Sequence, residues 1–291
     1  MSIQISNKRQ LVNGVEIFYR EAGNRKNPAV LLLHGFPTSS VMFKNLMTAL
    51  ADKYYLVAPD YPGFGFSDFP DQKHFSYSFD NIAAVMAAFA EAIGLDRFFI
   101  YLHDYGATIG LRLCLRNPAK ILGLIVQNGN AYEEGLGPQW DETKDYWANP
   151  APEKKERFMS FLSEEGTKAQ YVAGLPDHLL PRVGPELWTL DWTLMSRPGN
   201  IDMQAELNFD YRNNPPLFKT FQAYFRDNQP PALVIWGRYD VFFSVEEAHC
   251  YQLDLPAAEL HILEAGHMPL ETNFDEVSAL ISAFLERHTS S

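Results

Sequence analysis

The sequence has little cysteine and no long apolar run. Cys114 and Cys250 are the only cysteines in 291 residues, and no group of histidines and cysteines has the spacing of zinc ligands. We therefore expect neither a disulfide framework nor a metal site. Residues 1–14 lack the apolar core of a signal peptide, and the most apolar stretch, residues 82–95, is too short to cross a bilayer. These absences predict a cytoplasmic protein without a membrane anchor.

Basic residues are also scarce. The chain has 24 Lys and Arg residues against 36 Asp and Glu residues, a formal net charge of −12. A surface with this charge repels phosphate backbones and anionic lipids, so we expect no nucleic acid and no membrane as partners. The glycine-rich turn at residues 60–68 lacks the lysine of a Walker loop and the spacing of a dinucleotide fingerprint, so no cofactor is expected. The expected partner is a hydrophobic small molecule, and the expected state is a monomer or a homodimer.

The apolar pattern predicts an α/β fold. Apolar residues make up 46% of the chain, which is enough to bury a full core. Over residues 1–130, short β-branched runs alternate with windows of helical apolar spacing, as in successive βα units of a mostly parallel sheet. The predicted helices cover residues 43–51, 79–93, 108–116 and 275–286. The predicted strands are Val15–Tyr19, Val30–Leu33, Tyr54–Ala58, Phe98–Leu102, Leu122–Asn128, Ala232–Trp236 and Glu259–Leu263.

One segment departs from this pattern. Between residues 129 and 230, Trp, Tyr, Pro and charged residues crowd together, and no run has the composition of a buried strand. Pro230-Pro231 ends the segment, after which the strand pattern resumes. We therefore predict a helical cap at residues 129–230, inserted into a core of residues 1–128 and 231–291.

A sharp turn follows the predicted strand at residues 98–102. Asp104 stands at this turn, and Gly106 and Gly110 follow it, so the next helix can approach the strand closely. This is the setting of a nucleophile elbow, whose central side chain stands near free backbone N–H groups. A carboxylate there can attack carbon without first losing a proton. Asp104 is therefore the candidate nucleophile, although Leu102 occupies the position where such elbows usually have glycine.

Two further candidates come after later strands. Asp240 follows the predicted strand at residues 232–236, where its carboxylate could orient an imidazole and fix its tautomer. His267 follows the strand at residues 259–263 and could activate a water molecule as a general base. The order Asp104, Asp240, His267 is the chain order of such triads.

The segment His34-Gly35-Phe36-Pro37 also follows a predicted strand. Its bend would aim the Phe36 backbone N–H at the reacting centre, where it would form an oxyanion hole with the Tyr105 N–H. Such fixed donors are needed to stabilise the negative charge that develops on an ester intermediate. We interpret His34 itself as a structural hydrogen-bonding residue.

Several motifs together resemble one branch of a known family. They are His34-Gly-Phe-Pro37, Asp60-x-x-Gly63-x-Gly65-x-Ser67, His103-Asp104-Tyr-Gly106, Gly237-x-x-Asp240 and Gly266-His267. Over nearly the whole core the chain is similar to the epoxide hydrolase and haloalkane dehalogenase branch of the α/β-hydrolase superfamily, and the cap matches loosely. The resemblance implies an α/β-hydrolase fold and an aspartate nucleophile, and it leaves the substrate open.

The resemblance also bears on the leaving group. Haloalkane dehalogenases of this branch typically have tryptophan directly after the nucleophile and often asparagine in the His-Gly-x-Pro loop, where this chain has Tyr105 and Phe36. Fluoroacetate-type dehalogenases usually have arginine after the nucleophile to bind a carboxylate, a charge that Tyr105 cannot supply. The familiar donors for a halide or a haloacid are therefore missing.

Epoxide hydrolases of this branch instead protonate the ring oxygen with cap tyrosines, one of them in a Tyr-Arg pair near the end of the cap. Tyr211-Arg212 matches that place, and a neutral phenol can donate a hydrogen bond to an oxygen that becomes an alkoxide. An apolar pocket lined by aromatic residues would suit a hydrophobic substrate. The resemblance makes Tyr211 the leading proton donor, with Tyr146, Tyr171 or Tyr132 as the second donor and Trp147 among the pocket residues.

We therefore expect Asp104 to attack an epoxide carbon, tyrosines to protonate the oxygen, and water activated by His267 and Asp240 to cleave the ester into a vicinal diol. Two alternatives stay open. The same triad could hydrolyse a haloalkane or haloacid, which halide release would reveal. A non-catalytic small-molecule binder or receptor on this fold would instead form a stable complex without turnover.

Overall fold

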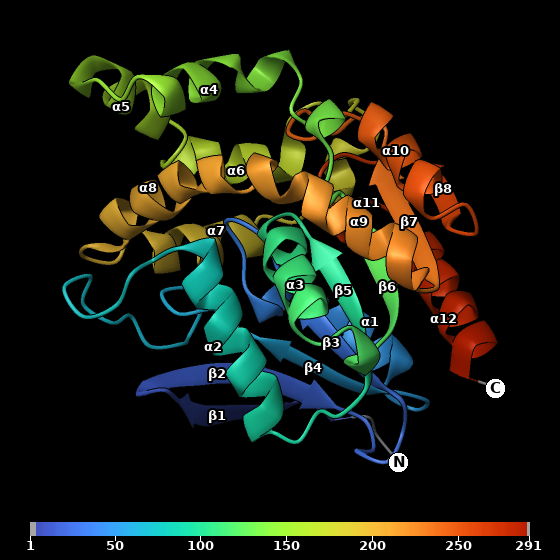
Figure 1. Cartoon of the computed structure of the whole chain (residues 1–291). Coiled ribbons are helices and arrows are strands. Elements are labelled where there is room, and N and C mark those ends of the chain that lie inside the picture. Colours follow the sequence, from blue (N-terminus) through green and yellow to red (C-terminus); the bar gives the residue numbers. More distant parts are fainter. Residues whose placement is uncertain (1–3, 290–291) are drawn as a thin grey trace.

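A mostly parallel sheet forms the centre of the molecule (Figure 1). The structure is a computed structural model that describes residues 4–289. The strands are β1 (Ser6–Val12), β2 (Val15–Ala22), β3 (Ala29–Leu33), β4 (Tyr55–Pro59), β5 (Phe98–His103), β6 (Ile121–Gln127), β7 (Ala232–Gly237) and β8 (Glu259–Leu263). Their order is β1-β2-β4-β3-β5-β6-β7-β8. The pairs β1–β2 and β2–β4 are antiparallel, and the other described pairs are parallel.

Helices cover both faces of the sheet because its central strands are apolar on both sides. All of β3 is buried: Val30 and Leu32 belong to the apolar cluster on one face, and Leu31 and Leu33 belong to the cluster on the other. The predicted α/β architecture, a mostly parallel sheet flanked by helices, is confirmed. One face carries α2 (Phe79–Ala92), α3 (Tyr105–Arg116), α9 (Phe218–Asn228) and α10 (Glu246–Asp254); the other carries α1 (Lys44–Leu50) and α12 (Phe274–Thr289). Short turns of helix lie at η1 (Ser40–Phe43), η2 (Pro118–Lys120) and α11 (Pro269–Thr272).

The strand β1 is missing from the prediction. It pairs along its whole length with β2 through a turn at Asn13 and Gly14, both of which have positive φ. Its sequence, Ser-Asn-Lys-Arg-Gln-Leu-Val, shows no apolar alternation because most of this edge strand is exposed to solvent. The Asn-Gly pair, a strong signal for a two-residue hairpin turn, could have revealed it.

Two helices also differ from the prediction. α3 begins at Tyr105 rather than at residue 108, so its first turn is part of the sharp bend after β5. Gly106 makes this possible, because a Cβ there would lie 2.3 Å from the Leu33 carbonyl oxygen. α10 was not predicted, because its sequence is rich in polar residues and buries only a narrow face that includes Ala248 and Tyr251.

Between β6 and β7 the chain forms helices and connecting segments, without a strand. In Figure 1, α4 and α5 lie farthest from the sheet, and α6, α7 and α8 lie between them and the sheet. α9 packs against α3 and α10 on the core, so the part of the insertion that stands above the sheet ends near Leu217. The elements before α9 are η3 (Glu133–Gly135), η4 (Pro138–Trp140), α4 (Asp141–Ala148), α5 (Pro152–Met159), α6 (Glu164–Val172), η5 (Leu180–Arg182), α7 (Glu186–Met195), α8 (Asn200–Asp210), η6 (Tyr211–Asn213) and η7 (Pro215–Leu217).

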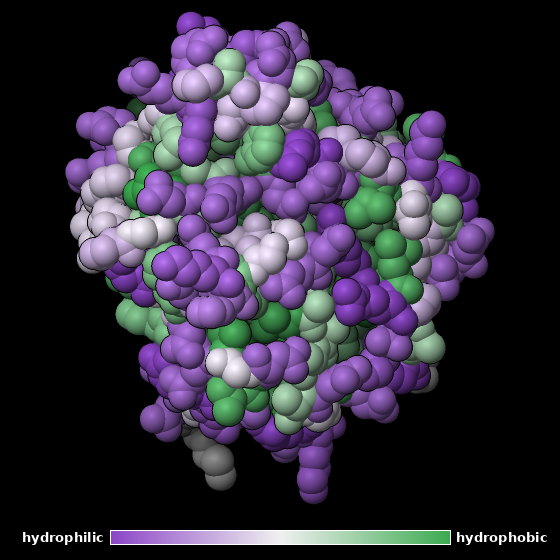
Figure 2. Space-filling view, turned by 60° about the vertical axis from the view of Figure 1, so that its left-hand side comes forward, coloured by the Kyte–Doolittle hydropathy of each residue, from purple (hydrophilic) through white to green (hydrophobic). Residues whose placement is uncertain are grey.

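The surface is mainly polar. Figure 2 shows hydrophilic residues over most of one face, with apolar residues in scattered patches between them. This agrees with the acidic composition of the chain. Within residues 4–289, no helix combines the length and the apolar character needed to pass through a bilayer.

A buried carboxyl group anchors the start of the insertion to the core. Glu247, in the first turn of α10, accepts hydrogen bonds from the backbone N–H groups of Ala131 and Tyr132 at 2.5 and 2.9 Å and from Asn130 Nδ2 at 2.9 Å. Gly135 lets the chain pass this close, since a Cβ there would lie 1.6 Å from Glu247 Oε2. The segment after β6 is therefore held against α10 by polar contacts inside the core.

We predict that Glu247→Ala destabilises the fold by about 3 kcal/mol or more, because it leaves three buried donors without an acceptor at a cost of about 1 kcal/mol or more each. Urea unfolding followed by circular dichroism measures the free energy of unfolding. Glu246→Ala is the matched control, since this neighbouring carboxyl is exposed and bonds the half-buried Ser244 hydroxyl. Equal losses of stability in the two variants would contradict the anchoring role.

Candidate active site

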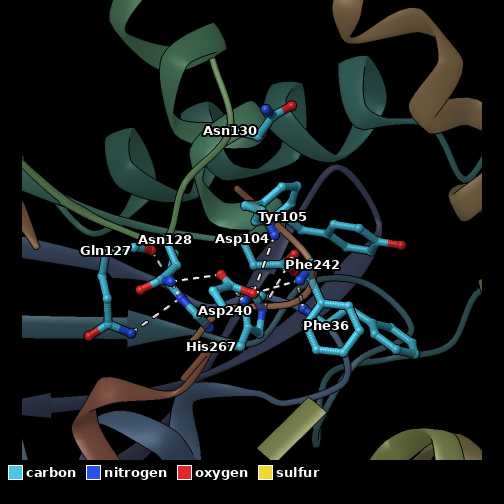
Figure 3. A network of polar contacts seen from close by, with 12 residues as sticks. Phe36, Asp104, Tyr105, Gln127, Asn128, Asn130, Asp240, Phe242 and His267 are labelled. Carbon is cyan, nitrogen blue, oxygen red and sulfur yellow. Dashed lines mark hydrogen bonds and ion pairs between the residues drawn. The ribbon is translucent and has the colours of Figure 1, made fainter. Parts of the chain in front are cut away.

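Loops from five parallel strands meet at one edge of the sheet. β3, β5, β6, β7 and β8 have their carboxyl ends there, which is where ligands bind in open parallel sheets. The segments after these strands carry Phe36, Asp104, Asn128, Asp240 and His267, and Figure 3 shows them gathered in one place. Side chains that are far apart in the sequence thus form one polar cluster.

Asp104 stands on the turn between β5 and α3. Its backbone has φ 50° and ψ −117°, a conformation that residues with side chains rarely adopt. The Asp104 N–H donates to the Asn128 carbonyl at 3.2 Å, and the Asp104 carbonyl accepts from the Ala107 N–H at 2.9 Å. Gly35 lies directly against the turn, where a Cβ would be 2.4 Å from Asp104 Cβ. These contacts hold the carboxyl group at the end of a strand-turn-helix bend, the geometry of a nucleophile elbow.

Two backbone N–H groups hold the Asp104 carboxylate. The Phe36 N–H donates to Oδ1 at 2.5 Å, and the Tyr105 N–H also hydrogen-bonds the carboxyl group. Burial raises the pKa of Asp104 to about 6, against the opposing effects of the nearby His267 and of these two N–H groups. The side chain is therefore mostly a carboxylate at pH 7.

Asp240 orients His267. His267 Nδ1 lies 2.9 Å from Asp240 Oδ2. The carboxylate also accepts hydrogen bonds from Asn128 Nδ2 at 2.7 Å and from the backbone N–H groups of Phe242 and Phe243 at 2.7 and 3.2 Å. Burial lowers the pKa of His267, but the negative charge of the neighbouring carboxylates and the hydrogen bond to Asp240 outweigh it. The pKa of His267 is therefore raised above its ordinary value of 6.5.

The other ring nitrogen of His267 faces Asp104. Nε2 is 3.9 Å from Asp104 Oδ2, too far for a hydrogen bond, and it has no hydrogen-bond partner among the described residues. Because Nδ1 donates to Asp240, Nε2 is the acceptor in the neutral ring. The imidazole is therefore placed to take a proton from a water molecule that approaches the Asp104 carboxyl carbon.

Two other histidines lie under the cluster. His34 Nδ1 bonds the Gly35 carbonyl at 2.9 Å, the His34 ring stacks on Tyr61, and burial lowers its pKa to about 3. The His103 ring lies 4.9 Å from the His267 ring, and burial lowers the pKa of His103 well below 6.5, with a further decrease from His267. Both rings are neutral at pH 7, so they add no positive charge next to His267.

A cavity of about 390 Å³ opens above Asp104. Most of its wall is apolar, which suits a hydrophobic small molecule. Among the residues of the wall, none is Lys or Arg, so no fixed positive charge faces the carboxylate from across the cavity. The apolar residues are Phe36, Trp140, Phe161, Val241, Phe242 and Phe243.

The polar side chains of the cavity wall differ in whether their hydrogen-bond donors are already used in bonds within the protein. The Trp140 indole N–H donates to the Phe242 carbonyl at 2.7 Å, and Gln139 Nε2 donates to the same carbonyl at 3.0 Å. Asn208 Nδ2 donates to the Tyr105 hydroxyl oxygen at 2.9 Å, so the phenol proton is not used in this bond. Thr143 and Gln170 complete the polar wall. Within residues 4–289, no group of three or more His, Cys, Asp or Glu side chains is placed to hold a metal ion.

A family model described as the alpha/beta hydrolase fold matches residues 28–274, which is most of the chain. The protein belongs to the α/β-hydrolase family. Members of this family have a sharp strand-turn-helix bend at the site, followed later in the chain by an acidic residue and a histidine. In this chain Asp104 stands on such a bend, Asp240 follows β7 and His267 follows β8.

Relatives of this α/β-hydrolase include enzymes of two kinds. An uncharacterised hydrolase of Saccharomyces cerevisiae is 40% identical over 284 residues, which cover 96% of this chain and 97% of that protein. Epoxide hydrolase 4 of Mus musculus is 27% identical over 289 residues, with coverages of 95% and 78%. A haloalkane dehalogenase loop variant from Bradyrhizobium elkanii has a similar crystal structure, with a TM-score of 0.78, 20% identity and 98% coverage of each chain. The expected resemblance to the epoxide hydrolase and haloalkane dehalogenase branch is confirmed, and the chain is a hydrolase.

The cap residue Tyr211 lies behind the cavity wall of this α/β-hydrolase. Its ring is 5.9 Å from that of Tyr105 and 5.1 Å from that of Trp140, both of which face the cavity. The Tyr211 hydroxyl donates to Asn130 Oδ1 at 3.0 Å and is fully buried. Trp147 stacks on the Tyr211 ring at 6.0 Å and is not part of the described wall.

The other three tyrosines named from the sequence are not among the described wall residues of the cavity either, and their role in substrate binding stays a prediction. The Tyr132 hydroxyl donates to Asp254, and the Tyr171 hydroxyl donates to Asp191. Tyr146 packs against two phenylalanine rings of the cap. Each of these aromatic rings is buried in packing that spacing along the chain does not reveal.

Sequence reasoning missed the amides of the site. Asn128 holds both acidic residues of the site in place, because its carbonyl accepts from the Asp104 N–H and its Nδ2 donates to Asp240. Its place at the end of a predicted strand, on the same sheet edge as Asp104, was a usable signal. Asn208 had no such signal, because it comes from α8, and only the packing of the cap places it next to Tyr105.

We predict that the pKa of His267 falls below 6.5 in Asp240→Asn, because burial then acts without the principal carboxylate that raises the pKa of the imidazolium. Titration of the histidine ring protons by NMR measures this pKa. Glu259→Gln removes the same charge from a surface ion pair with Arg287 and serves as the matched control, in which the His267 pKa stays raised. A raised pKa in Asp240→Asn would contradict the assigned electrostatics.

Proposed function

We propose that this α/β-hydrolase opens an epoxide through a covalent ester on Asp104 and releases a vicinal diol. The observation that carries the proposal is the Asp104 carboxylate at the floor of an apolar cavity, held by two backbone N–H groups and faced by His267 Nε2 at 3.9 Å. A positioned carboxylate and a separate base for water are the parts that a two-step ester mechanism needs.

In the first step, an Asp104 carboxylate oxygen attacks an epoxide carbon, and the bond between that carbon and the ring oxygen breaks. The attack needs no general base because the nucleophile is already ionised at pH 7. Holding the two reactants together in the cavity replaces a bimolecular encounter by an oriented one, which can contribute several kcal/mol. The ring oxygen leaves as an alkoxide unless an acid protonates it.

In the second step, His267 takes a proton from water, and the hydroxide adds to the Asp104 carboxyl carbon. The carbonyl oxygen of the ester becomes negative in the tetrahedral intermediate, where the Phe36 and Tyr105 N–H groups stabilise it. Asp240 stabilises the imidazolium that forms. The intermediate then expels the diol oxygen, which takes the proton from His267.

The cavity favours an uncharged substrate with an oxygen leaving group. Its described wall has no Lys or Arg to bind a haloacid, and its indole N–H, from Trp140, donates to a backbone carbonyl rather than into the cavity. A halide needs only donors that solvate it, whereas an alkoxide needs a proton, which a phenol such as that of Tyr105 can supply. The relative named epoxide hydrolase 4 supports the same substrate class.

We predict that His267→Gln accumulates an ester on Asp104, because the base that hydrolyses it is absent. Turnover should fall by about 10²–10⁴-fold, the usual contribution of a general base. Intact-protein mass spectrometry after exposure to styrene oxide or cyclohexene oxide detects the adduct, and peptide mapping locates it. An adduct with the mass of the whole epoxide, placed on Asp104, is the expected result.

Butyl chloride and butyl bromide are the comparison substrates for the same variant. A butyl adduct with release of halide, without any adduct from the epoxides, would reassign the protein to dehalogenation. Asp104→Asn is the control that must prevent all adducts. A folded His267→Gln protein that binds a ligand yet forms no adduct with either class would favour the non-catalytic binder.

We predict that the rate of ester formation rises through an apparent pKa of about 6, because only the ionised Asp104 attacks. Below this pH the rate falls by about tenfold per unit. Ester hydrolysis requires neutral His267, whose pKa is raised above 6.5, so this step declines first as the pH is lowered. Rapid-quench measurements of a single turnover across pH separate the two steps. Ester formation that is independent of pH between 5 and 7 would contradict the carboxylate nucleophile.

A further inference from the structure

We propose that the Tyr105 hydroxyl, oriented by the Asn208 amide, donates the proton that the ring oxygen takes when the epoxide opens. This inference rests on the proposed function and assigns its acid step to the residue next to the nucleophile. The sequence had pointed to Tyr211 in the cap for this role.

Tyr105 is the one tyrosine among the described wall residues of the cavity. Tyr105, Asp104 and Asn208 all belong to the cavity wall. The Tyr105 ring is held on three sides, by Phe79 at 4.9 Å and by Phe36 and Tyr211 at 5.9 Å each. These contacts fix the direction of the hydroxyl group, so it is placed before substrate enters.

The hydrogen bond from Asn208 determines which way the phenol can donate. Asn208 Nδ2 is the donor to the Tyr105 oxygen at 2.9 Å. A phenol has one proton and can accept at the same time, so the Tyr105 proton remains available to another acceptor. Because both residues line the cavity, a ring oxygen of a bound epoxide is an acceptor within this space.

The surroundings also keep Tyr105 protonated. Burial raises the pKa of Tyr105 far above its ordinary value, and the charge of Asp104 raises it further, against a small decrease from Asn208. The phenol therefore retains its proton at every pH at which Asp104 is ionised. It can release the proton when a more basic alkoxide forms beside it.

Tyr211 is engaged elsewhere. Asn130 Nδ2 donates to Glu247 Oε2 and to the Tyr132 carbonyl, each at 2.9 Å. These two acceptors orient the amide so that Oδ1 faces the Tyr211 hydroxyl at 3.0 Å. An amide oxygen only accepts, so Tyr211 must use its single proton in this bond. Tyr211 would have to break this buried bond and pass the ring of Tyr105 to reach the substrate.

The step balances in protons and electrons. As the bond between Asp104 oxygen and carbon forms, the electron pair of the broken carbon–oxygen bond passes to the ring oxygen, which takes the proton from Tyr105. Hydrolysis then releases Asp104 as a carboxylic acid, while the proton of the attacking water passes through His267 to the diol oxygen. The Asp104 acid ionises and its proton restores the Tyr105 phenol, through solvent, for the next cycle.

The test uses the full-length protein with His267→Gln as the background, so that the ester persists. Tyr105→Phe and Tyr211→Phe are each added to this background, and Tyr77→Phe is the matched control. Tyr77 is also a buried residue, and its hydroxyl donates to the Pro70 carbonyl at 2.8 Å, outside the described cavity wall. After rapid mixing with styrene oxide and quenching, intact mass spectrometry gives the rate of ester formation.

We expect Tyr105→Phe to slow ester formation by about 10²–10⁴-fold, the usual contribution of a general acid. Tyr211→Phe should slow it much less, and Tyr77→Phe should leave the background rate unchanged. A Tyr105→Phe rate equal to the background rate, or a larger loss in Tyr211→Phe, overturns the inference while the ester mechanism stands. The absence of any Asp104 ester in the His267→Gln background overturns the proposed function itself.

Two further measurements separate proton donation from a structural effect. In Tyr105→Phe with His267 intact, NMR titration should still give a raised pKa for His267, because the Asp104 and Asp240 charges stay in place. Asn208→Ala, in the His267→Gln background, keeps the phenol and removes its orienting donor, so ester formation should slow by less than in Tyr105→Phe. An Asn208→Ala rate equal to the background rate would contradict the role of the amide.

Discussion

The buried carboxylate of Asp104 is the constraint on which the site depends. An ionised carboxyl group with a side chain only 9% exposed is costly unless hydrogen-bond donors and a base that can become positively charged lie close to it. The fold supplies these from three parallel strands: the Phe36 N–H after β3, the Tyr105 N–H after β5, and His267 after β8. The strained backbone of Asp104 and the side-chain-free Gly35 are consequences of bringing these groups so close together.

The same constraint explains why amides surround the carboxylates. Asp240 is held by Asn128 and by two backbone N–H groups, so neutral donors surround the carboxylate that orients His267. Asn130 also donates to the carboxyl group of Glu247 at the start of the insertion, where burial raises the pKa of Glu247 to about 8. Side-chain amides bond charged groups without adding charge, which leaves the electrostatic balance to Asp104, Asp240 and His267.

The insertion between β6 and β7 contributes packing and one orienting contact to the site. Its tyrosines are mostly held in packing or bonded to buried acceptors, as Tyr211 is to Asn130. Asn208 reaches from α8 to the Tyr105 hydroxyl, so the insertion and the core meet at the residue after Asp104. On a fold shared with proteins named epoxide hydrolase and haloalkane dehalogenase, this position and the wall around it are where chemistry can diverge.

The sequence by itself determined the α/β architecture and the places of Asp104, Asp240 and His267, because apolar strand runs and turn residues are local signals and parallel strands end at one edge. The exposed edge strand β1 was not predicted from the sequence, because most of its residues are exposed and its sequence shows no apolar alternation. Only the tertiary structure shows which tyrosine belongs to the described cavity wall. Tyr105, Tyr211 and the other tyrosines have equivalent chemistry in the sequence, and the distinction comes from packing between distant segments, which places Asn208 beside Tyr105 and Asn130 beside Tyr211.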